Sequence, residues 1–127
     1  MKNEGFLNLA NIPDYNEDDL FIASQWLWNL PHEEKEKITR KFYRGIVKVI
    51  KGDPSHKTFL EIGDESFDEK AKLPRLYEKI YWPCNDQGFK EMILKYQKIY
   101  YDNSIYLMNL IGEGLGLGSN YFNYLFV

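Results

Sequence analysis

The stretch DQGFKEMILKYQKIYYDNSIYLMNLIGEGL, from Asp86 to Leu115, carries the strongest structural pattern in the chain. Its apolar and aromatic residues recur at spacings of three and four, which is the period of one face of an α-helix. The members of this stripe are Phe89, Met92, Ile93, Tyr96, Ile99, Tyr100, Tyr106, Leu107, Leu110 and Ile111, with Asn103 as the one polar residue among them. The spacing predicts one continuous amphipathic helix over 86–115.

The opposite face of this helix is polar, and its residues are Glu91, Lys95, Lys98, Asp102, Asn109 and Glu113. A helix of about 25 residues is about 37 Å long. A compact globule of 127 residues is about equally wide. The stripe therefore needs a large partner surface. We expect the rest of the chain to leave part of it open, and the isolated chain to be marginally stable and to self-associate.

The glycine-rich stretch IGEGLGLGSNYF, residues 111–122, has two interpretations. A dinucleotide-binding loop needs glycines at relative positions one, three and six, after a strand and before a helix. Gly112 and Gly114 fit the first two positions, but Leu117 stands at the sixth and the stretch follows a helix. The pattern instead predicts a helix end, with Gly116 in the left-handed conformation and Leu117 folding back on the last turn.

Shorter elements are expected upstream. GFLNLAN (5–11) has the character of a short strand, and EDDLFIASQWLWNL (17–30) that of a helix capped by Asp14 or Asn16. Pro31 suits the first turn of a second short helix, PHEEKEKI (31–38). The expected fold is thus rich in helices before residue 40.

The middle and end of the chain complete the expected fold. YRGIVKVIKGD (43–53) and KTFLEIGD (57–64) have the composition of strands, whereas ESFDEKAKLPRLYEKIYWP (65–83) is irregular. Ser119 is placed to cap a last short helix in NYFNYLF (120–126). The sequence predicts an α+β fold, with one long helix, shorter helices and a few short strands, in a single domain over 1–127.

Composition restricts the classes of function. The chain is 44% hydrophobic and has a net charge of -3 with no dominant basic cluster, which argues for an ordered domain and against a nucleic-acid partner. No apolar run approaches the ~18 residues of a membrane span. Cys84 is the only cysteine, which excludes an intrachain disulfide and a zinc site built of cysteines. We expect a cytoplasmic protein in which this thiol is buried or idle.

Several segments in this order resemble the N-terminal region of the non-haem Fe(II), 2-oxoglutarate-dependent oxygenases of the isopenicillin-N-synthase-like kind. EGFLNLAN is similar to that family's GFF-x-hydrophobic-x-NHG strand, although Ile12 and Pro13 replace its His-Gly. WNLPHEEKEKI resembles its F-x-LP-x-EEK-x-K segment. YRG, KTFLEIGDES and the run from YWPCNDQGF to LGL resemble its RGY element, its KE-x-F-x-hydrophobic-G strand, and its WP loop, long helix and cap. The resemblance spans roughly residues 5–122.

The resemblance implies a catalytic jelly-roll core downstream of this region, which this chain does not contain. In the family, a His-x-Asp pair and a distant His hold Fe(II), and an Arg-x-Ser pair holds 2-oxoglutarate. The only histidines here are His32 and His56, and no Arg-x-Ser triplet occurs. His32-x-Glu34 copies the first spacing but falls in the first turn of an expected surface helix. We therefore expect no catalytic, metal or cofactor residues in this chain, which looks shortened at both ends relative to the family.

Two functions remain open from the sequence. In the first, the chain is the N-terminal segment of a 2-oxoglutarate/Fe(II) oxygenase, supporting the jelly roll and walling its substrate pocket without catalytic competence. In the second, it is a stand-alone α+β interaction module that binds another protein through the apolar face of helix 86–115.

The acidic pairs Asp64–Glu65 and Asp68–Glu69 are expected to be loop residues, because nothing beside them would perturb their pKa values.

Overall fold

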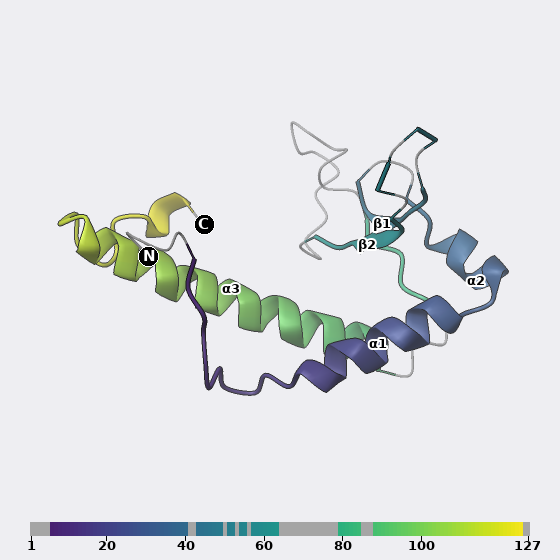
Figure 1. Ribbon diagram of the computed structural model, residues 1–127, viewed down its shortest axis with the longest axis horizontal. Helices are drawn as coiled ribbons and strands as arrows, with labels where there is room; N and C mark the ends of the chain where they lie inside the picture. Colours follow the sequence, from purple (N-terminus) through teal and green to yellow (C-terminus); the bar gives the residue numbers. More distant parts are fainter. Residues whose placement is uncertain are drawn as a thin grey trace. The chain divides into compact units, whose positions relative to one another are not determined.

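The computed structural model describes residues 6–40, 43–49, 51–52, 54–55, 57–63, 79–84 and 88–125 (Figure 1). Their elements, in chain order, are α1 (Glu17–Asn29), α2 (His32–Lys37), β1 (Gly45–Val47), β2 (Phe59–Glu61), α3 (Phe89–Gly114) and the 3-10 helix η1 (Asn123–Leu125). The chain divides into two compact units. Unit 1 comprises Met1–Ala23 with Phe89–Val127, and unit 2 comprises Ser24–Gly88. The expectation of one domain over 1–127 stays a prediction.

Helix α3 confirms the central expectation from the sequence. It is 26 residues long and runs without a break through Asn103. The Asn103 side chain stays compatible with the helix because its Nδ2 donates a hydrogen bond to the Ile99 carbonyl at 2.7 Å. The helix starts after Gly88, whose φ of 85° is foreign to a helix. Asp86, at the predicted start, lies outside the described residues.

The end of α3 is closed by the predicted glycine cap. Gly116 has a φ of 73°. Its N–H donates to the Glu113 carbonyl at 2.9 Å, and the Leu117 N–H donates to the Gly112 carbonyl at 2.9 Å. These two bonds are the pair that defines a Schellman motif. The glycine-rich stretch therefore ends a helix, at the end that carries the negative pole of the helix dipole and repels phosphate.

The chain turns after this cap and returns toward α3. A Cβ added at Gly112 would lie 2.5 Å from the Gly118 carbonyl oxygen and 3.8 Å from the Phe122 ring. The glycine thus lets the returning segment touch the helix. The sequence predicts a helix over 120–126. In the described residues this region forms only the short 3-10 helix η1, which begins three residues after Asn120.

The first helix begins where the sequence predicts. The Asn16 Oδ1 accepts a hydrogen bond from the Asp18 N–H at 3.1 Å, so Asn16 rather than Asp14 is the N-cap. Asp14 instead forms a tight turn, in which the Tyr15 N–H donates to the Ile12 carbonyl at 3.3 Å. Asp14 has a φ of 58° there. A proline followed by a residue with positive φ is the pattern of a type II turn.

The strand predicted over 5–11 is wrong for its described part. Residues 6–10 have no regular structure, and every one of them is exposed. An isolated extended segment leaves its backbone hydrogen-bonding groups to water unless a neighbouring strand pairs with it. In the described residues the only strands are β1 and β2, and both pair with each other.

Unit 2 contains α2 and the sheet. Pro31 is the N-cap of α2, and its carbonyl accepts hydrogen bonds from the N–H groups of Glu34 and Lys35. The two predicted strands are confirmed but contribute only three residues each, paired antiparallel with Ile46 opposite Leu60. Much of the predicted irregular segment, namely residues 65–78, lies outside the described residues. The described part of the protein is thus α+β.

Each unit buries a small set of apolar side chains. The buried residues of unit 1 are Ala23, Phe89 and Tyr96, and those of unit 2 are Leu27, Ile38, Ile46, Val47 and Ile80. No buried polar or charged residue occurs among the described residues. None of the helices in the described part is both long enough and apolar enough to cross a membrane.

Candidate functional site

Tyr96 fixes α3 to the start of α1 within unit 1. Its side chain is only 1% exposed. Its hydroxyl accepts a hydrogen bond from the Asn16 N–H at 2.9 Å and lies 2.6 Å from the Asn16 carbonyl and 2.8 Å from Asp19 Oδ2. A phenol has one proton to donate, so these two acceptors share it. The residue that caps α1 is thereby held by a side chain 80 positions along the chain.

Two further tyrosines surround this contact. The Tyr15 ring meets the Tyr96 ring edge-on at 5.6 Å between centroids, and the Tyr100 ring lies 6.4 Å from each of them. Burial raises the pKa of the Tyr96 hydroxyl, and the Asp19 carboxylate raises it further against the opposing effect of the Asn16 N–H. Burial and the Tyr15 hydroxyl likewise raise the pKa of Tyr100. Neither phenol is thus prepared to act as a base.

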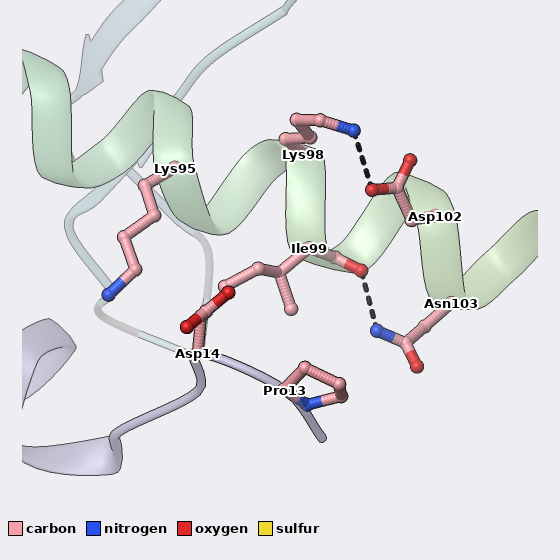
Figure 2. Close-up of a pocket in the computed structure, with 7 residues that line it drawn as sticks. All are labelled: Pro13, Asp14, Lys95, Lys98, Ile99, Asp102 and Asn103. Carbon is pink, nitrogen blue, oxygen red and sulfur yellow. Dashed lines mark hydrogen bonds and ion pairs between the residues drawn. The ribbon is translucent and has the colours of Figure 1, made fainter.

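A cavity of about 400 Å³ lies beside this cluster (Figure 2). The turn before α1 forms one wall and α3 forms the other; the lining residues are Pro13, Asp14, Lys95, Lys98, Ile99, Asp102 and Asn103. Figure 2 shows Pro13 and Asp14 facing the helix across the cavity, with the Ile99 side chain projecting from α3 toward them. The volume is within the range of small-molecule sites, roughly 300–1,000 Å³.

Three of the four charged residues that line the cavity have an ion-pair partner. Lys98 Nζ lies 2.6 Å from Asp102 Oδ2, and Lys95 Nζ lies 3.4 Å from Asp19 Oδ2. The side chains of Lys95 and Lys98 are 44% and 73% exposed, so water screens both pairs. The wall holds no histidine, cysteine, serine or threonine. The arrangement offers a surface hollow but no activated nucleophile or general base.

The C-terminal half of the α3 stripe forms a second and larger feature, which we call the open face. It consists of Tyr100, Asn103, Tyr106, Leu107 and Leu110. Tyr100, Tyr106 and Leu110 are 48%, 59% and 45% exposed, in contrast to Tyr96 one turn earlier. Asn103 and Leu107 are partly exposed. The stripe is therefore buried at Phe89 and Tyr96 in its N-terminal half and only partly covered from Tyr100 onward.

The residues considered as metal ligands lie apart from these features. His32 is on α2 with its side chain 82% exposed, 3.4 Å from Glu36 Oε1. Glu34 is paired with Lys37 at 2.5 Å. The structure therefore does not bring His32 and Glu34 into a common site. His56 and the acidic pairs at 64–65 and 68–69 lie outside the described residues.

In the part of the chain that the structure describes, neither the cysteine nor the acidic residues form a metal site. Cys84 is a free thiol at the surface, so of the two expected alternatives the buried one is wrong and the idle one stays a prediction. Its neighbours Trp82 and Pro83 belong to a segment without regular structure. Within the described ranges, no three His, Cys, Asp or Glu side chains gather closely enough to hold a metal ion.

Only part of the candidate site can be found from sequence patterns. Helical spacing places Tyr96, Ile99 and Tyr100 in the stripe, but it predicts neither the hydroxyl contacts of Tyr96 nor the cavity. A tyrosine inside an apolar stripe is a signal in itself, because a buried phenol needs a polar partner. Its partner is the turn at Asn16, 80 residues away in the sequence, and no pattern near Tyr96 indicates which residue that partner is.

Comparison of the chain with protein-family models, with curated proteins and with solved structures finds no match.

Proposed function

We propose that this chain is a non-catalytic packing segment, the N-terminal region of a 2-oxoglutarate/Fe(II)-dependent oxygenase of the isopenicillin-N-synthase-like kind. In this function α3 packs on a jelly-roll core and helps wall the substrate pocket. We also propose that the protein is located in the cytoplasm. The observation that carries it is the open face of α3, where three large side chains from Tyr100 to Leu110 stay about half exposed.

The open face supports packing against a further protein surface on energetic grounds. Burying a large apolar side chain contributes ~1.5–3 kcal/mol. Because the three residues are already about half buried, covering them completely would contribute roughly 2–5 kcal/mol in total, a sizeable share of the net stability of a domain. Contiguous apolar surface of this kind is typical of interaction sites. We propose a jelly-roll core as this surface because several segments of the chain resemble the oxygenase family in the same order.

The described residues do not fit the Fe(II) and 2-oxoglutarate sites of such an oxygenase. His32 and Glu34 are engaged with Glu36 and Lys37 on the surface of α2. Arg40 is paired with Glu61 at 2.6 Å and is followed by Lys and Phe instead of x-Ser. Accordingly, the proposal assigns no catalytic step to this chain. Iron and cosubstrate belong to the core on which the chain would pack.

Sequencing of the full-length transcript past the Val127 codon tests the proposal. A continuing reading frame that encodes His-x-Asp, a distant His and Arg-x-Ser would support it. An authentic stop codon would contradict it.

Turnover offers a second test: we expect no succinate release from 2-oxoglutarate by the purified chain with added Fe(II). Release above a protein-free control that His32→Ala abolishes would show that this assignment is wrong.

A second candidate function is a stand-alone interaction module. The observation in its favour is that exposed apolar side chains continue past α3, at Leu115, Leu117, Tyr121, Tyr124 and Leu125. The exposed surface of unit 1 is thus longer than the helix. A stop codon directly after Val127 would favour this function over the first.

A further inference from the structure

We propose that the cavity between the turn before α1 and helix α3 binds a small organic cation, an ammonium group attached to an apolar body. In this arrangement the ammonium contacts Asp14, and the apolar body lies on Pro13 and Ile99. The inference concerns unit 1 alone, so it holds or fails independently of the functions proposed above. It rests on the pairing of charges around the cavity, on the atoms that its lining offers to a ligand, and on the backbone of the turn.

The charges around the cavity leave one carboxylate without a cation. Lys98 Nζ lies 2.6 Å from Asp102 Oδ2, and Lys95 Nζ lies 3.4 Å from Asp19 Oδ2. Each lysine thus already faces a carboxylate, whereas Asp14, which also lines the cavity, has no ion-pair partner in the described part of the chain. Because carboxylates outnumber ammonium groups here, the region attracts a cation more than an anion.

Asp14 and Asn103 offer hydrogen-bond acceptors to a ligand. The Asn103 Nδ2 donates to the Ile99 carbonyl at 2.7 Å, which fixes the amide so that Oδ1 is the atom left for a further hydrogen bond. An ionised carboxylate such as that of Asp14 is an acceptor only, and an ammonium group is a donor only. A ligand that donates hydrogen bonds therefore complements these two residues.

Pro13 and Ile99 give the two walls of the cavity an apolar surface (Figure 2). A metal ion would gain nothing from these side chains, and no three His, Cys, Asp or Glu side chains of the described ranges gather closely enough to hold one. The cavity volume of about 400 Å³ is large enough for an organic body. The lining is thus better suited to a cation that carries an apolar group.

The turn that carries Asp14 has an unfavourable backbone. Asn11 and Asp14 have φ values of 55° and 58°, and they are the non-glycine residues with positive φ in the described part of the chain. Positive φ costs energy for a residue with a side chain, and such positions cluster at ligand sites. Glycine would suit the backbone at position 14 better, but aspartate places a carboxylate at the cavity.

Titration of the full 127-residue chain with phenethylamine, followed by two-dimensional NMR at neutral pH, tests the proposal. We expect a Kd on the order of 1 mM, with shifts of the amide resonances of Asp14, Ile99 and Asn103. Phenylpropionate has a similar shape and the opposite charge, and ethylamine lacks the apolar ring. Each of these two probes should bind at least about tenfold more weakly, because each loses one of the two contacts.

Asp14→Asn separates binding from folding. Asparagine tolerates positive φ as aspartate does, so the variant should keep its melting temperature. Its Kd for phenethylamine should rise about tenfold, because the hydrogen bond to a charged group is lost. Asp18→Asn makes the same charge change in the exposed first turn of α1 and should leave the Kd within about twofold of wild type.

Three results would each overturn the proposal. The first is the absence of shifts at Asp14, Ile99 and Asn103 at millimolar phenethylamine. The second is binding of phenylpropionate or ethylamine as tight as that of phenethylamine. The third is equal affinity of the Asp14→Asn and Asp18→Asn variants for phenethylamine.

Discussion

At the scale of single residues, the backbone conformation of each glycine near the end of α3 decides what it contributes. Gly112, Gly114 and Gly116 are two residues apart, yet they occupy three different environments. Gly112 faces the Gly118 carbonyl, Gly114 is helical with open space where a Cβ would be, and Gly116 has a positive φ with equally open space. The same alanine substitution should therefore give three different results.

Alanine at each position gives the first prediction. Gly114→Ala should stabilise the chain by about 0.5–1 kcal/mol, because alanine loses less backbone entropy in a helix. Gly116→Ala should destabilise it by roughly 1 kcal/mol, and Gly116→Val by more, because side chains resist positive φ. Gly112→Ala should be destabilising as well, since its Cβ would overlap the Gly118 carbonyl. Urea unfolding of the three variants measures this order, and a Gly116 variant as stable as the Gly114 variant would contradict the cap.

The second prediction concerns the Tyr96 hydroxyl. Tyr96→Phe keeps the ring but leaves the Asn16 N–H without the hydroxyl that it meets at 2.9 Å. An unsatisfied donor at a partly buried site is costly. We expect the melting temperature to fall by roughly 5 °C, whereas the control Tyr106→Phe, on an exposed ring, should change it little.

Alkaline titration checks the same contact independently. The pKa of Tyr96 is raised in the folded chain by burial and by Asp19. The folded state therefore holds this proton more tightly than the unfolded state, in which the phenol has a pKa near 10. Its contribution to stability is complete below that value and is lost as the pH rises through the folded pKa. The unfolding free energy should fall less steeply above about pH 10 in Tyr96→Phe than in wild type, and equal slopes would argue against the contact.

At the scale of secondary structure, the sheet of unit 2 depends on one central residue. Ile46 is buried, pairs with Leu60, and exchanges backbone hydrogen bonds with the segment after α2. Its N–H donates to the Ile38 carbonyl at 2.8 Å, and its carbonyl accepts from the Arg40 N–H at 3.0 Å. β1 is therefore held from both sides even though it is only three residues long.

Truncation in β1 gives the third prediction. Ile46→Ala should destabilise the chain by about 2–4 kcal/mol, because it leaves a cavity in a closed site. Val49→Ala, at an exposed position two residues after β1, should change stability by no more than about 0.5 kcal/mol. Thermal unfolding followed by circular dichroism compares the two. Equal losses would mean that the buried side chain of Ile46 does not carry the sheet.

The helices can be predicted from hydrophobic periodicity and from the residues at their ends. The existence and length of a strand depend instead on which other strand pairs with it. α3 and its cap follow from local information, namely a stripe with helical spacing and glycines after it. The two strands were recognised from β-branched residues, but their short length depends on which partner is present. Residues 6–10 show the same limit, because their composition suits a strand and they have no strand beside them in the described part. The Tyr96 contact depends on tertiary structure alone, since Asn16 lies 80 residues away.

At the scale of the whole molecule, an uncovered stripe links the fold to the proposed functions. A chain that leaves Tyr100, Tyr106 and Leu110 about half exposed has apolar surface available to a core, a partner or a second copy. All three occupants would bury the same side chains. The state of this face in solution is therefore the property on which the account depends.

Removing the apolar character of the face gives the fourth prediction. Leu110→Asp should abolish self-association at every accessible concentration, because association through this face would bury an unpaired carboxylate. It should leave thermal stability within about 1 kcal/mol of wild type, since Leu110 is 45% exposed in the single chain. Light scattering with chromatography measures the first effect and calorimetry the second. Unfolding of the variant would mean that Leu110 is a core residue of the chain.

Hydroxyl-radical labelling read by mass spectrometry tests the central claim most directly, because it reports the exposure of each tyrosine in solution. In dilute wild-type chain we predict rapid modification of Tyr106 and Tyr100 and strong protection of Tyr96, which is 1% exposed. In concentrated chain Tyr106 should become protected, and in Leu110→Asp it should stay reactive at both concentrations. Protection of Tyr106 in the dilute wild-type chain would contradict the account, because it would show that the chain covers the stripe by itself.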